Sequence, residues 1–479
     1  MNTNEVLKKL NILKNTMPDL LIHRVEFSVF KNVYIISTES LSSGDKTNDF
    51  VLKYFSNRSF KSNKDSLKDS IKNFVPSINQ VEVKNYKDLL NKLFNGYTIV
   101  LYKSEGFAFE TRAILDRGVS EPKSEPTIKG PKDSFTENYN INIGLIRKRI
   151  KSDNLSLIEN IVGKYSMSKV GVMYLCDTAD QEVVNNVIKK IKEINIDGIL
   201  DAEYIKELIS KDYKSAFPTI ISTEKPDDVC KQLLEGKIII TVENSPTVLI
   251  IPTFLIDFFQ YSEDYYHTPF YASFIRIVRV MAFILAVLTP ALYLSLTTYN
   301  QEILPTSLLV NFAIQRDAVP FPAFIEALFL LIPFEILFEG DARTPAGRST
   351  SLSILGALIL GEAAVSAGLI SPIMIIVVSI SAISSLLFVY YDLQGAITFW
   401  KYLLMILSGL FGILGLIIGC FLLLANLCTI KSFGKPYLLP FSPFYKNEQS
   451  NALTRKNIKN IKYRKRYLSS TNLVKNRSK

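Results

Sequence analysis

Three long stretches in the second half of this chain are almost free of charge, and they constrain its fold more than any other feature. Residues 280–298, 349–391 and 402–430 contain a single acid or base, Glu362. A helix rises about 1.5 Å per residue, so about 19 residues cover most of the roughly 30 Å hydrocarbon core of a bilayer. From residue 1 to about residue 271, charged residues instead recur every few positions. The pattern predicts a soluble α/β N-terminal region followed by an all-α integral membrane domain.

We expect the membrane domain to cover residues 272–431. Pro372 disfavours helical backbone at Ser371, so the stretch 349–391 should form two helices that meet there. Lys401 and Lys431 bracket the last apolar stretch, and their long side chains can reach the two head-group layers. The predicted membrane segments are therefore about 274–298, 349–370, 372–391 and 400–430, with 320–340 as a re-entrant or short element.

Residues 432–479 form a basic tail. From residue 446 to 479 there are 11 Lys and Arg residues and one acid, Glu448, a net +10 that equals the net charge of the whole chain. Such a segment is typical of the cytoplasmic side, either as a solvated end or as a site for lipid or protein. The N-terminus shows no apolar leader, so the soluble region should stay on that side too. Four membrane crossings satisfy both conditions, whereas five would place the tail on the opposite side.

The soluble region carries an internal repeat with an offset of 140 residues. The segment DLLNKLFNGYTIVLYKSEGFAFETRAIL aligns with DVCKQLLEGKIIITVENSPTVLIIPTFL, and Gly96 falls on Gly236. The same offset, without a gap, aligns VYIISTES with MYLCDTAD. Each copy has the pattern of a helix, a glycine stop, a strand, a tight turn and a second strand. We expect two related subdomains with mixed sheets, at residues 1–119 and 141–262, joined by a Pro- and Lys-rich linker at 120–140.

The soluble region shows none of the common catalytic motifs: no P-loop, no GxGxxG after a strand, no GxSxG and no HExxH. Asp177 and Asp180 follow a predicted strand, where such residues ordinarily form turns. The four cysteines and two histidines have no metal-ligand or disulfide spacing. We therefore expect no enzymatic activity, no cofactor, no metal site and no nucleic-acid partner. The helix that NIGLIRKRIKS opens has a basic face, which is either solvated or in contact with a membrane surface or partner.

Three glutamates in otherwise apolar segments, Glu326, Glu335 and Glu362, are the candidate functional residues. A carboxylate that faces lipid near the middle of a bilayer costs about 2.5–3.5 kcal/mol on insertion scales, so these side chains should face protein or water. Pro333 interrupts the helix between Glu326 and Glu335 and can change the angle between them. Glu339 is expected at the membrane interface instead.

Glu362 lies in the middle of a predicted span. Small residues recur at intervals of three or four along one side of that helix, which permits close approach of a neighbouring helix. Glu362 projects to another side, in a stripe that includes Ser366, and could face a cavity. A ring of such carboxylates in an oligomer would attract monovalent cations. The alternative is structural: Glu362 is hydrogen bonded, or it pairs with Arg343 or Arg348 between helices.

Four segments of this chain resemble the A subunits of GerA-type spore germinant receptors of Bacillus and Clostridium relatives. The resemblance runs from about residue 20 to residue 445 and is carried by GPKDSFTENYNINIGLIRKRI, PFPAFIEALFLLIPFEILFEG, SILGALILGEAAVSAGLISPIMIIVVSISAISSLL and SFGKPYLLPFSP. It implies a bipartite N-terminal domain on the spore-core side and a membrane domain in the spore inner membrane. It also implies a transporter-like B subunit and a lipoprotein C subunit as partners, and oligomerisation into a cation channel opened by germinant.

Carried over position by position, the resemblance assigns two groups of residues. The ion pathway would include Glu326, Glu335 and Glu362, and the helix breaks involved in gating would include Pro320, Pro322, Ser371 and Pro372. From their places in the sequence, we add Ser366 to the pathway and Pro333 to the breaks. The chain departs from the family where Pro333 stands, and it has Glu362 where an amide is common. These departures leave the charge of the pore open.

We therefore expect a germinant-gated, oligomeric cation-channel subunit in contact with membrane lipids. Two other functions fit the same residues. A secondary transporter or lipid translocator would use the glutamates as proton relays, and inverted repeats, which would favour it, are not visible in the sequence. A membrane-anchored scaffold of the receptor complex would use the glutamates only to pair helices. A paralogue of the A subunit with another role in germination is also compatible with the sequence.

Overall fold

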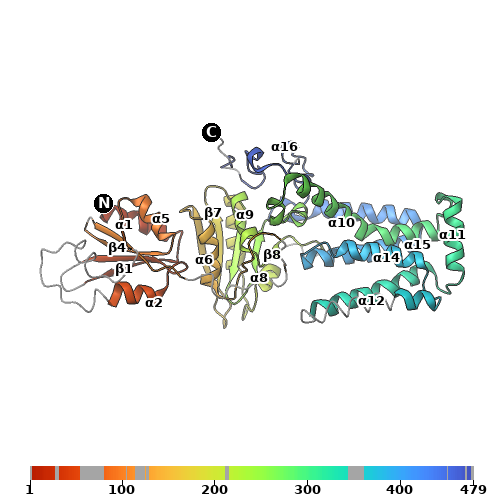
Figure 1. Cartoon of the computed structure of the whole chain (residues 1–479), viewed down its shortest axis with the longest axis horizontal. Helices are drawn as coiled ribbons and strands as arrows, with labels where there is room; N and C mark the ends of the chain where they lie inside the picture. Colours follow the sequence, from red (N-terminus) through yellow and green to blue (C-terminus); the bar gives the residue numbers. More distant parts are fainter. Residues whose placement is uncertain are drawn as a thin grey trace.

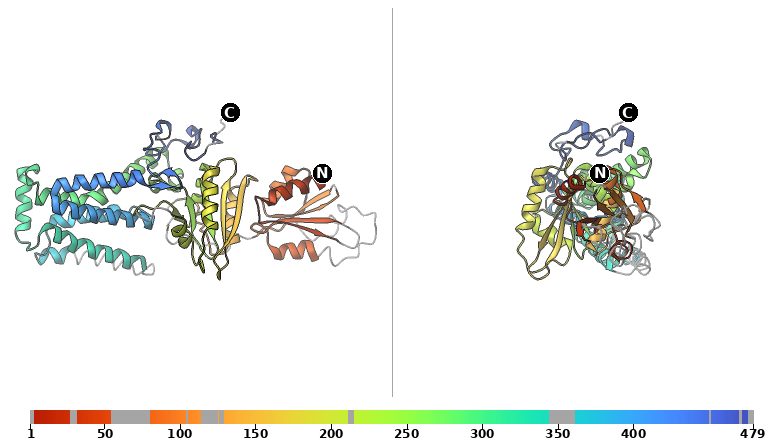
Figure 2. Two further views of the ribbon diagram at one scale, coloured as in Figure 1. Left: turned by 180° about the vertical axis from the view of Figure 1, so that it is seen from behind. Right: turned by 90° about the vertical axis from the view of Figure 1, so that its left-hand side faces the viewer.

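The molecule is elongated, with two β-sheet subdomains in succession along its long axis and a group of long helices at the other end (Figure 1). The structure, a computed structural model, describes residues 3–26, 32–53, 80–103, 105–113, 125, 129–210, 215–343, 361–449, 451–469 and 472–475. Figure 2 shows the same succession from behind. The predicted fold class, an α/β N-terminal region followed by an all-α part, is therefore confirmed.

The first subdomain is a five-stranded sheet flanked by short helices. Its elements are α1 (Thr3–Lys14), β1 (Leu20–Val25), β2 (Val33–Thr38), α2 (Gly44–Thr47), the π-helix η1 (Asn48–Leu52), β3 (Gln80–Glu82), α5 (Tyr86–Leu93), β4 (Tyr97–Tyr102) and β5 (Glu105–Glu110). The strand order is β1-β2-β4-β5-β3. Leu10 of α1 and Leu89 of α5 are fully buried in one core with Ile36 and Ile99 of the sheet.

The second subdomain has a sheet with helices on both faces. Its elements are α6 (Tyr139–Arg149), β6 (Leu155–Val162), β7 (Ser168–Leu175), α7 (Gln181–Lys192), α8 (Ala202–Ile209), β8 (Ile221–Thr223), α9 (Pro226–Glu235), β9 (Ile238–Val242) and β10 (Val248–Ile251). Successive residues of a strand point to opposite faces. Ile240 accordingly packs in the core with α7 and α8, whereas Ile239 packs in a core with α6 and α9 that continues into the long helices.

The two sheets repeat one topology, which confirms the predicted internal repeat. The order β6-β7-β9-β10-β8 corresponds strand by strand to that of the first sheet. Gly96 and Gly236, which the 140-residue offset aligns, both have positive φ, 78° and 102°. Each lies between a helix and the central strand that follows it. Glycine adopts this backbone without the steric cost that a side chain would bring.

The strand registers correct two details of the predicted repeat. Ile36 pairs with Ile99 in the first sheet, and Met173 pairs with Ile239 in the second. Ile99 and Ile239 are 140 positions apart, but Ile36 and Met173 are 137 apart, so the alignment of VYIISTES with MYLCDTAD is wrong by three residues. All described strand pairs of the two sheets are antiparallel, so the expectation of mixed sheets is also wrong.

A buried ion pair joins the two subdomains. Arg147 of α6 lies 2.8 Å from Asp19, and the two side chains are 0% and 2% exposed. Ser40 donates a further hydrogen bond of 2.7 Å to the Asp19 carboxylate. Neither sequence interpretation of the basic helix therefore holds for Arg147, which faces neither solvent nor a membrane. Arg149 of the same helix binds Asp133 at 2.6 Å.

The chain passes from the second sheet into the long helices through two 3-10 turns. The remaining elements are η2 (Leu255–Phe259), η3 (Ser262–Tyr265), α10 (Pro269–Thr298), η4 (Gln301–Ile303), α11 (Thr306–Asp317), α12 (Ala323–Arg343), α14 (Pro372–Ser385), α15 (Tyr391–Thr429), β11 (Lys431–Ser432), β12 (Lys435–Pro436), α16 (Lys446–Gln449) and η5 (Ile458–Asn460). Among the described residues, α10 and α15 are long and apolar enough to cross a membrane, and α14 is a shorter apolar helix.

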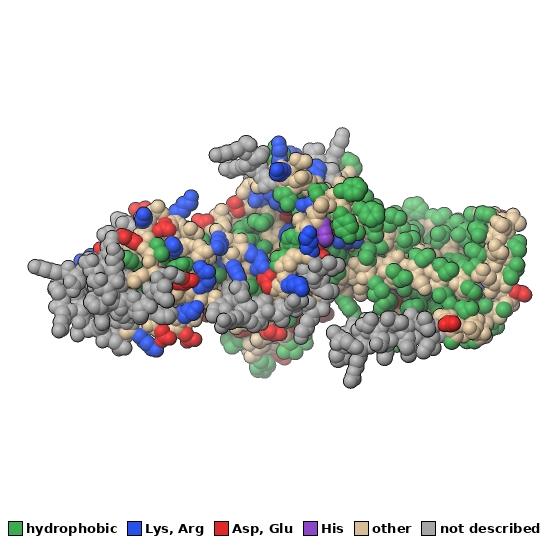
Figure 3. Space-filling view, in the orientation of Figure 1, with side chains coloured by type: hydrophobic (Ala, Val, Ile, Leu, Met, Phe, Trp, Pro, Cys, Tyr) green, Lys and Arg blue, Asp and Glu red, His purple; other side chains and the backbone are tan. Residues whose placement is uncertain are grey.

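The long helices run back and forth along the axis of the molecule. α10 leads away from the sheets, α11 crosses the distal end, and α12 and α14 return (Figure 1). Apolar side chains cover the surface of this part, whereas charged side chains are dispersed over the sheets (Figure 3). An extended apolar surface of this kind marks contact with a membrane or with other chains.

α15 is a hairpin of two helical limbs. Gly412 inside it has φ 61° and ψ −138°, which is not helical. The backbone N–H of Ile413 donates to Asn300 at the distal end, at 3.1 Å. Farther along, Asn426 accepts a hydrogen bond of 3.0 Å from Ser215 at the end nearest the sheets. The first limb therefore runs away from the sheets, and the second limb returns to them.

Two predicted membrane segments can be compared with the structure over their length, and a third only in part. The single span over residues 400–430 is wrong, because a Cβ at Gly415 would lie only 1.9 Å from the carbonyl oxygen of Leu407, eight positions earlier, where the chain has reversed. The re-entrant or short element predicted at 320–340 is the 21-residue helix α12, which is not short; that it is re-entrant stays a prediction. Most of the segment predicted at 349–370 falls outside the described residues, which resume at residue 361 in a helix.

The basic tail packs along the second subdomain, so the expectation of a solvated end is wrong for part of it. Arg464 donates to the carbonyl oxygen of Leu234 at 2.9 Å, and Lys475 forms an ion pair with Glu235 at the end of α9. Asn472 donates to Asp177 at 2.9 Å. The sheets and the tail thus lie at the same end of the helices (Figure 2).

Gly412→Ala tests the reversal of α15. A side chain at this φ and ψ is strained, and its Cβ would lie 2.7 Å from the Cβ of Tyr299. We expect the substitution to destabilise the protein by about 1–3 kcal/mol, measured as a lower apparent Tm of the purified chain. Gly395→Ala is the matched control in the same element, because nothing lies within 4 Å of its added Cβ. Equal Tm values for the two variants would contradict the hairpin.

Candidate functional site

Glu326 and Ser371, two residues singled out in the sequence for different reasons, are brought together at the distal end of the helices. The backbone N–H of Ser371 donates to the Glu326 carboxylate at 2.5 Å, and its hydroxyl donates to the same oxygen. Ser371 has extended backbone and is the N-cap of α14, whose first residue is Pro372. A carboxylate next to the N-terminus of a helix interacts favourably with the helix dipole. Glu326 therefore fixes the start of α14.

The second oxygen of Glu326 faces a cation. Arg316 of α11 has its Nε 3.9 Å from this oxygen, and the Glu326 side chain is 0% exposed. Neither of these two atoms has a hydrogen-bond partner among the described residues. Buried polar atoms are nearly always hydrogen bonded. The Arg316 Nε and the second Glu326 oxygen can therefore each still form a hydrogen bond. The arrangement joins α11, α12 and the start of α14 at one point.

Glu335 pairs with a lysine that the sequence interpretation had placed at a membrane interface. Lys401 of α15 lies 2.8 Å from Glu335 of α12, and the two side chains are 3% and 33% exposed. Thr398, one turn earlier in α15, donates to the same carboxylate oxygen at 3.4 Å. The expectation that Lys401 extends to a head-group layer is therefore wrong. Lys401 instead neutralises an acid within the apolar part.

Glu362 and Ser366 lie on one exposed face. They are four residues apart in the helical segment that begins at residue 361, and both side chains are exposed. Residues four apart share a helix face. Arg343, one of the two arginines considered as partners, is bound to Glu339, with its Nε 2.7 Å from the carboxylate, while Arg348 is outside the described residues. Glu362 is therefore exposed, whereas Glu326 and Glu335 are bound by other residues of the chain.

The prolines occupy different places relative to the helices. Pro320 and Pro322 precede α12, and the carbonyl oxygen of Pro322 accepts the backbone N–H of Glu326 at 3.1 Å. Pro333 lies inside α12, where it removes one backbone donor without ending the helix. Pro372 is the first residue of α14. Pro320 and Pro322 thus lie in the break between α11 and α12, and Ser371 and Pro372 lie in the break before α14.

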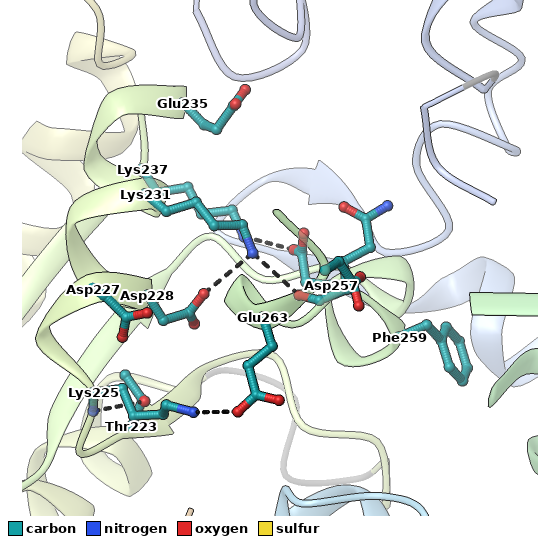
Figure 4. Close-up of polar contacts among 12 residues, drawn as sticks. Thr223, Lys225, Asp227, Asp228, Lys231, Glu235, Lys237, Asp257, Phe259 and Glu263 are labelled. Carbon is teal, nitrogen blue, oxygen red and sulfur yellow. Dashed lines mark hydrogen bonds and ion pairs between the residues drawn. The ribbon is translucent and has the colours of Figure 1, made fainter. Parts of the chain in front are cut away.

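A cluster of buried ion pairs, which the sequence interpretation missed, connects α9 to the turns that lead into α10 (Figure 4). Lysines around α9 face acids of η2, η3 and α9 itself. The pairs are Lys225–Glu263 at 3.3 Å, Lys231–Asp228 at 3.2 Å and Lys237–Asp257 at 2.6 Å. Lys237 and Asp257 are 0% and 2% exposed, so this pair is the most deeply buried of the three.

The first turns of α10 are held by one aspartate. Asp264 of η3 binds Arg276 at 2.6 Å through one carboxylate oxygen and Arg279 at 2.8 Å through the other. Arg276 also donates to the carbonyl oxygen of Asn451 in the tail, at 3.0 Å. The spacing of the two arginines, three positions apart at the start of an apolar stretch, was the available sequence signal. Its acidic partner could not be inferred from that spacing.

The electrostatics of this cluster follow from burial and pairing. Burial would raise the pKa of Asp257, but the charges of Lys237 and Lys465 outweigh it and hold that pKa below its ordinary value. Glu125, described at the centre of the predicted linker, shows the opposite effect: burial, with the nearby charge of Asp228, raises its pKa to about 8. Asp257 is therefore ionised at neutral pH, whereas Glu125 is largely protonated.

Glu125 lines a cavity of about 360 Å³ between α9, η3, α10 and the loop before α15. Thr223 donates to its carboxylate at 3.0 Å. Asp228 and Arg279 line the same cavity. The cavity therefore lies where the soluble region meets the helices, and its charged groups belong to both.

Within the described residues, no group of three or more His, Cys, Asp or Glu side chains is placed to hold a metal ion. The described cysteines are free thiols, of which Cys230 is buried and Cys176 is exposed. The arrangement of acids and bases is that of paired charges between helices and turns. Asp257, Asp264 and Glu335 each bind a lysine or an arginine in this arrangement.

The chain was compared with known protein families and proteins. The model of the family described as Bacillus/Clostridium GerA spore germination protein matches residues 8–467. Spore germination protein KA of Bacillus subtilis (strain 168) is 37% identical over 374 residues, which cover 78% of this chain and 69% of that protein. Spore germination protein GerQA of Bacillus cereus is 35% identical over 408 residues, or 85% of this chain and 81% of that protein.

The chain is also similar to a membrane protein and to a solved structure. The uncharacterized membrane protein YfkQ of Bacillus subtilis (strain 168) is 34% identical over 457 residues, which cover 95% of this chain and 89% of that protein. The crystal structure of the N-terminal domain of the A subunit of the Bacillus megaterium spore germinant receptor GerK3 has a TM-score of 0.36 and 25% identity, and covers 51% of this chain and 93% of that chain.

Glu125→Gln tests the burial of the carboxyl group. In the folded protein the pKa of Glu125 is about 8, so the carboxyl group keeps its proton up to about that pH, whereas in the unfolded chain it loses the proton near its ordinary pKa of 4.5. The stability that this group contributes is therefore fully present below about pH 4.5 and is lost as the pH rises to about 8. We expect the apparent Tm of the wild type to fall relative to that of Glu125→Gln across this range. Glu137→Gln, at an exposed acid, is the control, and parallel pH profiles for all three proteins would contradict the assignment.

Proposed function

Because the chain belongs to the GerA family of Bacillus and Clostridium spore germination proteins, we propose that it is the A subunit of a nutrient germinant receptor. In this proposal it oligomerises in the spore inner membrane and forms a cation channel that germinant opens to start germination. Family membership over residues 8–467 supports the receptor role. The exposed carboxylate of Glu362, in an otherwise apolar helical segment, supports the channel role.

The ion pathway of the proposed channel passes along Glu362 and Ser366. An exposed carboxylate in an apolar helix is costly in lipid, so oligomerisation that turns it toward a hydrated passage would remove that cost. Glu326 and Glu335 already have partners within the chain, and we assign them to helix packing instead. A ring of Glu362 carboxylates would concentrate monovalent cations at the pore.

The proposed gate is driven from the soluble region. Ion pairs connect the two ends of α9 to η2 and η3 (Figure 4). A further pair, Arg279–Asp264, connects η3 to α10. A germinant-dependent movement of the partner B and C subunits would shift this platform and bias the helices toward an open arrangement. The B subunit would be the transporter-like, germinant-binding partner, and the C subunit a lipoprotein.

The scaffold function is the second candidate, and one observation favours it. Glu326 and Glu335 are bound inside a single chain, as expected if the acids serve only to pair helices. The transporter or lipid-translocator function has no corresponding support among the described contacts. Flux separates these functions: a channel passes ions without saturation, a transporter saturates and needs a counter-substrate, and a scaffold passes none.

Glu362→Ala tests the channel. The complex of A, B and C subunits, reconstituted in vesicles, should pass K⁺ when germinant is added, and Glu362→Ala should lower the K⁺ over Cl⁻ permeability ratio several-fold because the pore loses one negative charge per copy. The measurement is the reversal potential in a KCl gradient. Absence of flux from the wild-type complex in every activated state would favour the scaffold.

Two control variants accompany this test. Glu339→Ala removes another acid of the helical part, which is 54% exposed and bound to Arg343, and it should leave the permeability ratio unchanged. Glu335→Gln leaves Lys401 buried without its partner, so it should lower the apparent Tm rather than the selectivity. A selectivity change in Glu335→Gln as large as that in Glu362→Ala, with an unchanged Tm, would return Glu335 to the ion pathway.

The sidedness of the proposed channel can be measured separately. Because the sheets and the tail lie at one end of the helices (Figure 1), trypsin should cleave after the exposed Lys459 only in vesicles whose cytoplasmic face is outward. The same vesicles should expose the soluble region to cleavage. Cleavage of the two parts in vesicles of opposite orientation would support an odd number of crossings.

A further inference from the structure

An apolar groove lies between α10 and the returning limb of α15, at the end nearest the sheets. Its volume is about 540 Å³, and its lining is entirely apolar. Val287 and Leu427 form part of its wall and are only 2% and 3% exposed, whereas Ile284 and Leu424 of its lining are 47% and 53% exposed. The groove is therefore a preformed depression that is open along the apolar surface of the helices.

The tail closes the sheet-side end of this groove. Phe441 and Leu453 belong to its lining. The tail is fixed there because the backbone N–H of Arg455 donates to Ser273 of α10 at 2.9 Å, and Gln260 donates to the carbonyl oxygen of Ala452 at 2.8 Å. These hydrogen bonds fix the position of the tail relative to the groove.

Aromatic residues mark the level at which a membrane surface would cross this region. Phe270, Tyr271 and Phe274, in the first turns of α10, are 88%, 49% and 58% exposed. Aromatic side chains of this kind are enriched at the head-group level of a bilayer. Ser273, which holds the tail, lies in the same turns. The tail is therefore placed at the head-group level, and the groove extends from it into the apolar region.

Directly after Arg455, which Ser273 holds, the tail carries cations and apolar side chains in alternation. Lys456, Lys459 and Lys462 form no ion pair within the part of the chain that the structure describes. Between and after them, Ile458 and Tyr463 are 51% and 69% exposed. A segment that combines exposed apolar groups with unneutralised lysines is suited to an anionic membrane surface.

We propose that the groove holds an acyl chain of a phospholipid with an anionic headgroup, and that the headgroup phosphate lies against Lys456, Lys459 and Lys462. The apolar lining accepts the chain, and the lysines supply the opposite charge for the phosphate. A second copy of this protein fits the groove less well, because it would bring its own positive tail toward the first one. The bound lipid would connect α10, α15 and the tail, and through the tail the second subdomain.

The test uses the full chain, purified in detergent and analysed by native mass spectrometry. Dioleoylphosphatidylglycerol and dioleoylphosphatidylcholine have the same acyl chains and differ in headgroup charge. We expect the anionic lipid to be retained several-fold more than the zwitterionic one. Ile284→Trp, which fills the groove, should reduce retention of both lipids. Lys456→Gln, Lys459→Gln and Lys462→Gln together should remove the preference for the anionic lipid.

Leu292→Trp is the matched control for the groove variant. Leu292 lies on the same helix and is 43% exposed, but it does not line the groove, so this variant should retain both lipids as the wild type does. Equal retention of the two lipids by the wild type would overturn the proposal. So would an Ile284→Trp variant that keeps its lipid but loses self-association in mass photometry, because the groove would then be a contact between copies.

Discussion

Charges that are buried must find partners within the chain, and this requirement fixes how the parts of the protein are joined. Asp19 and Arg147 lock the two sheets together, Asp257 and Lys237 join the second sheet to the turns before α10, and Glu335 joins α12 to Lys401 of α15. Removal of one member of such a pair typically costs about 3–5 kcal/mol, because the other charge stays buried. These pairs therefore determine which elements move together.

The local features of the fold could be predicted from the sequence, and the partners of buried charges could not. Composition separated sheets from helices, and Gly96 and Gly236 revealed the repeat because a glycine stop is a local signal. Glu335 and Lys401 are 66 positions apart, and Asp19 and Arg147 are 128 apart. Such contacts depend on how whole elements pack, which hydrophobic patterns do not encode.

The candidate site shows the same division between local and long-range information. The backbone break before Pro372 is local, since the proline excludes helical backbone at Ser371. That Glu326 occupies this break, 45 positions away, follows only from the packing of α12 against α14. The reversal at Gly412 was missed because both limbs of α15 are apolar. Length and hydropathy measure the amount of membrane-compatible helix but not its direction.

The contacts around the second sheet decide which helices a signal from the soluble region can reach directly. Tyr390, just before α15, packs edge-on against Phe258 with ring centroids 5.4 Å apart, and Lys206 of α8 binds Asp392. α10 is held through Asp264. The α12 carboxylate of Glu335 is instead bound by Lys401, a residue of α15 itself. In the proposed channel, the sheets would thus move α10 and α15 first, and α12 would follow through that buried pair.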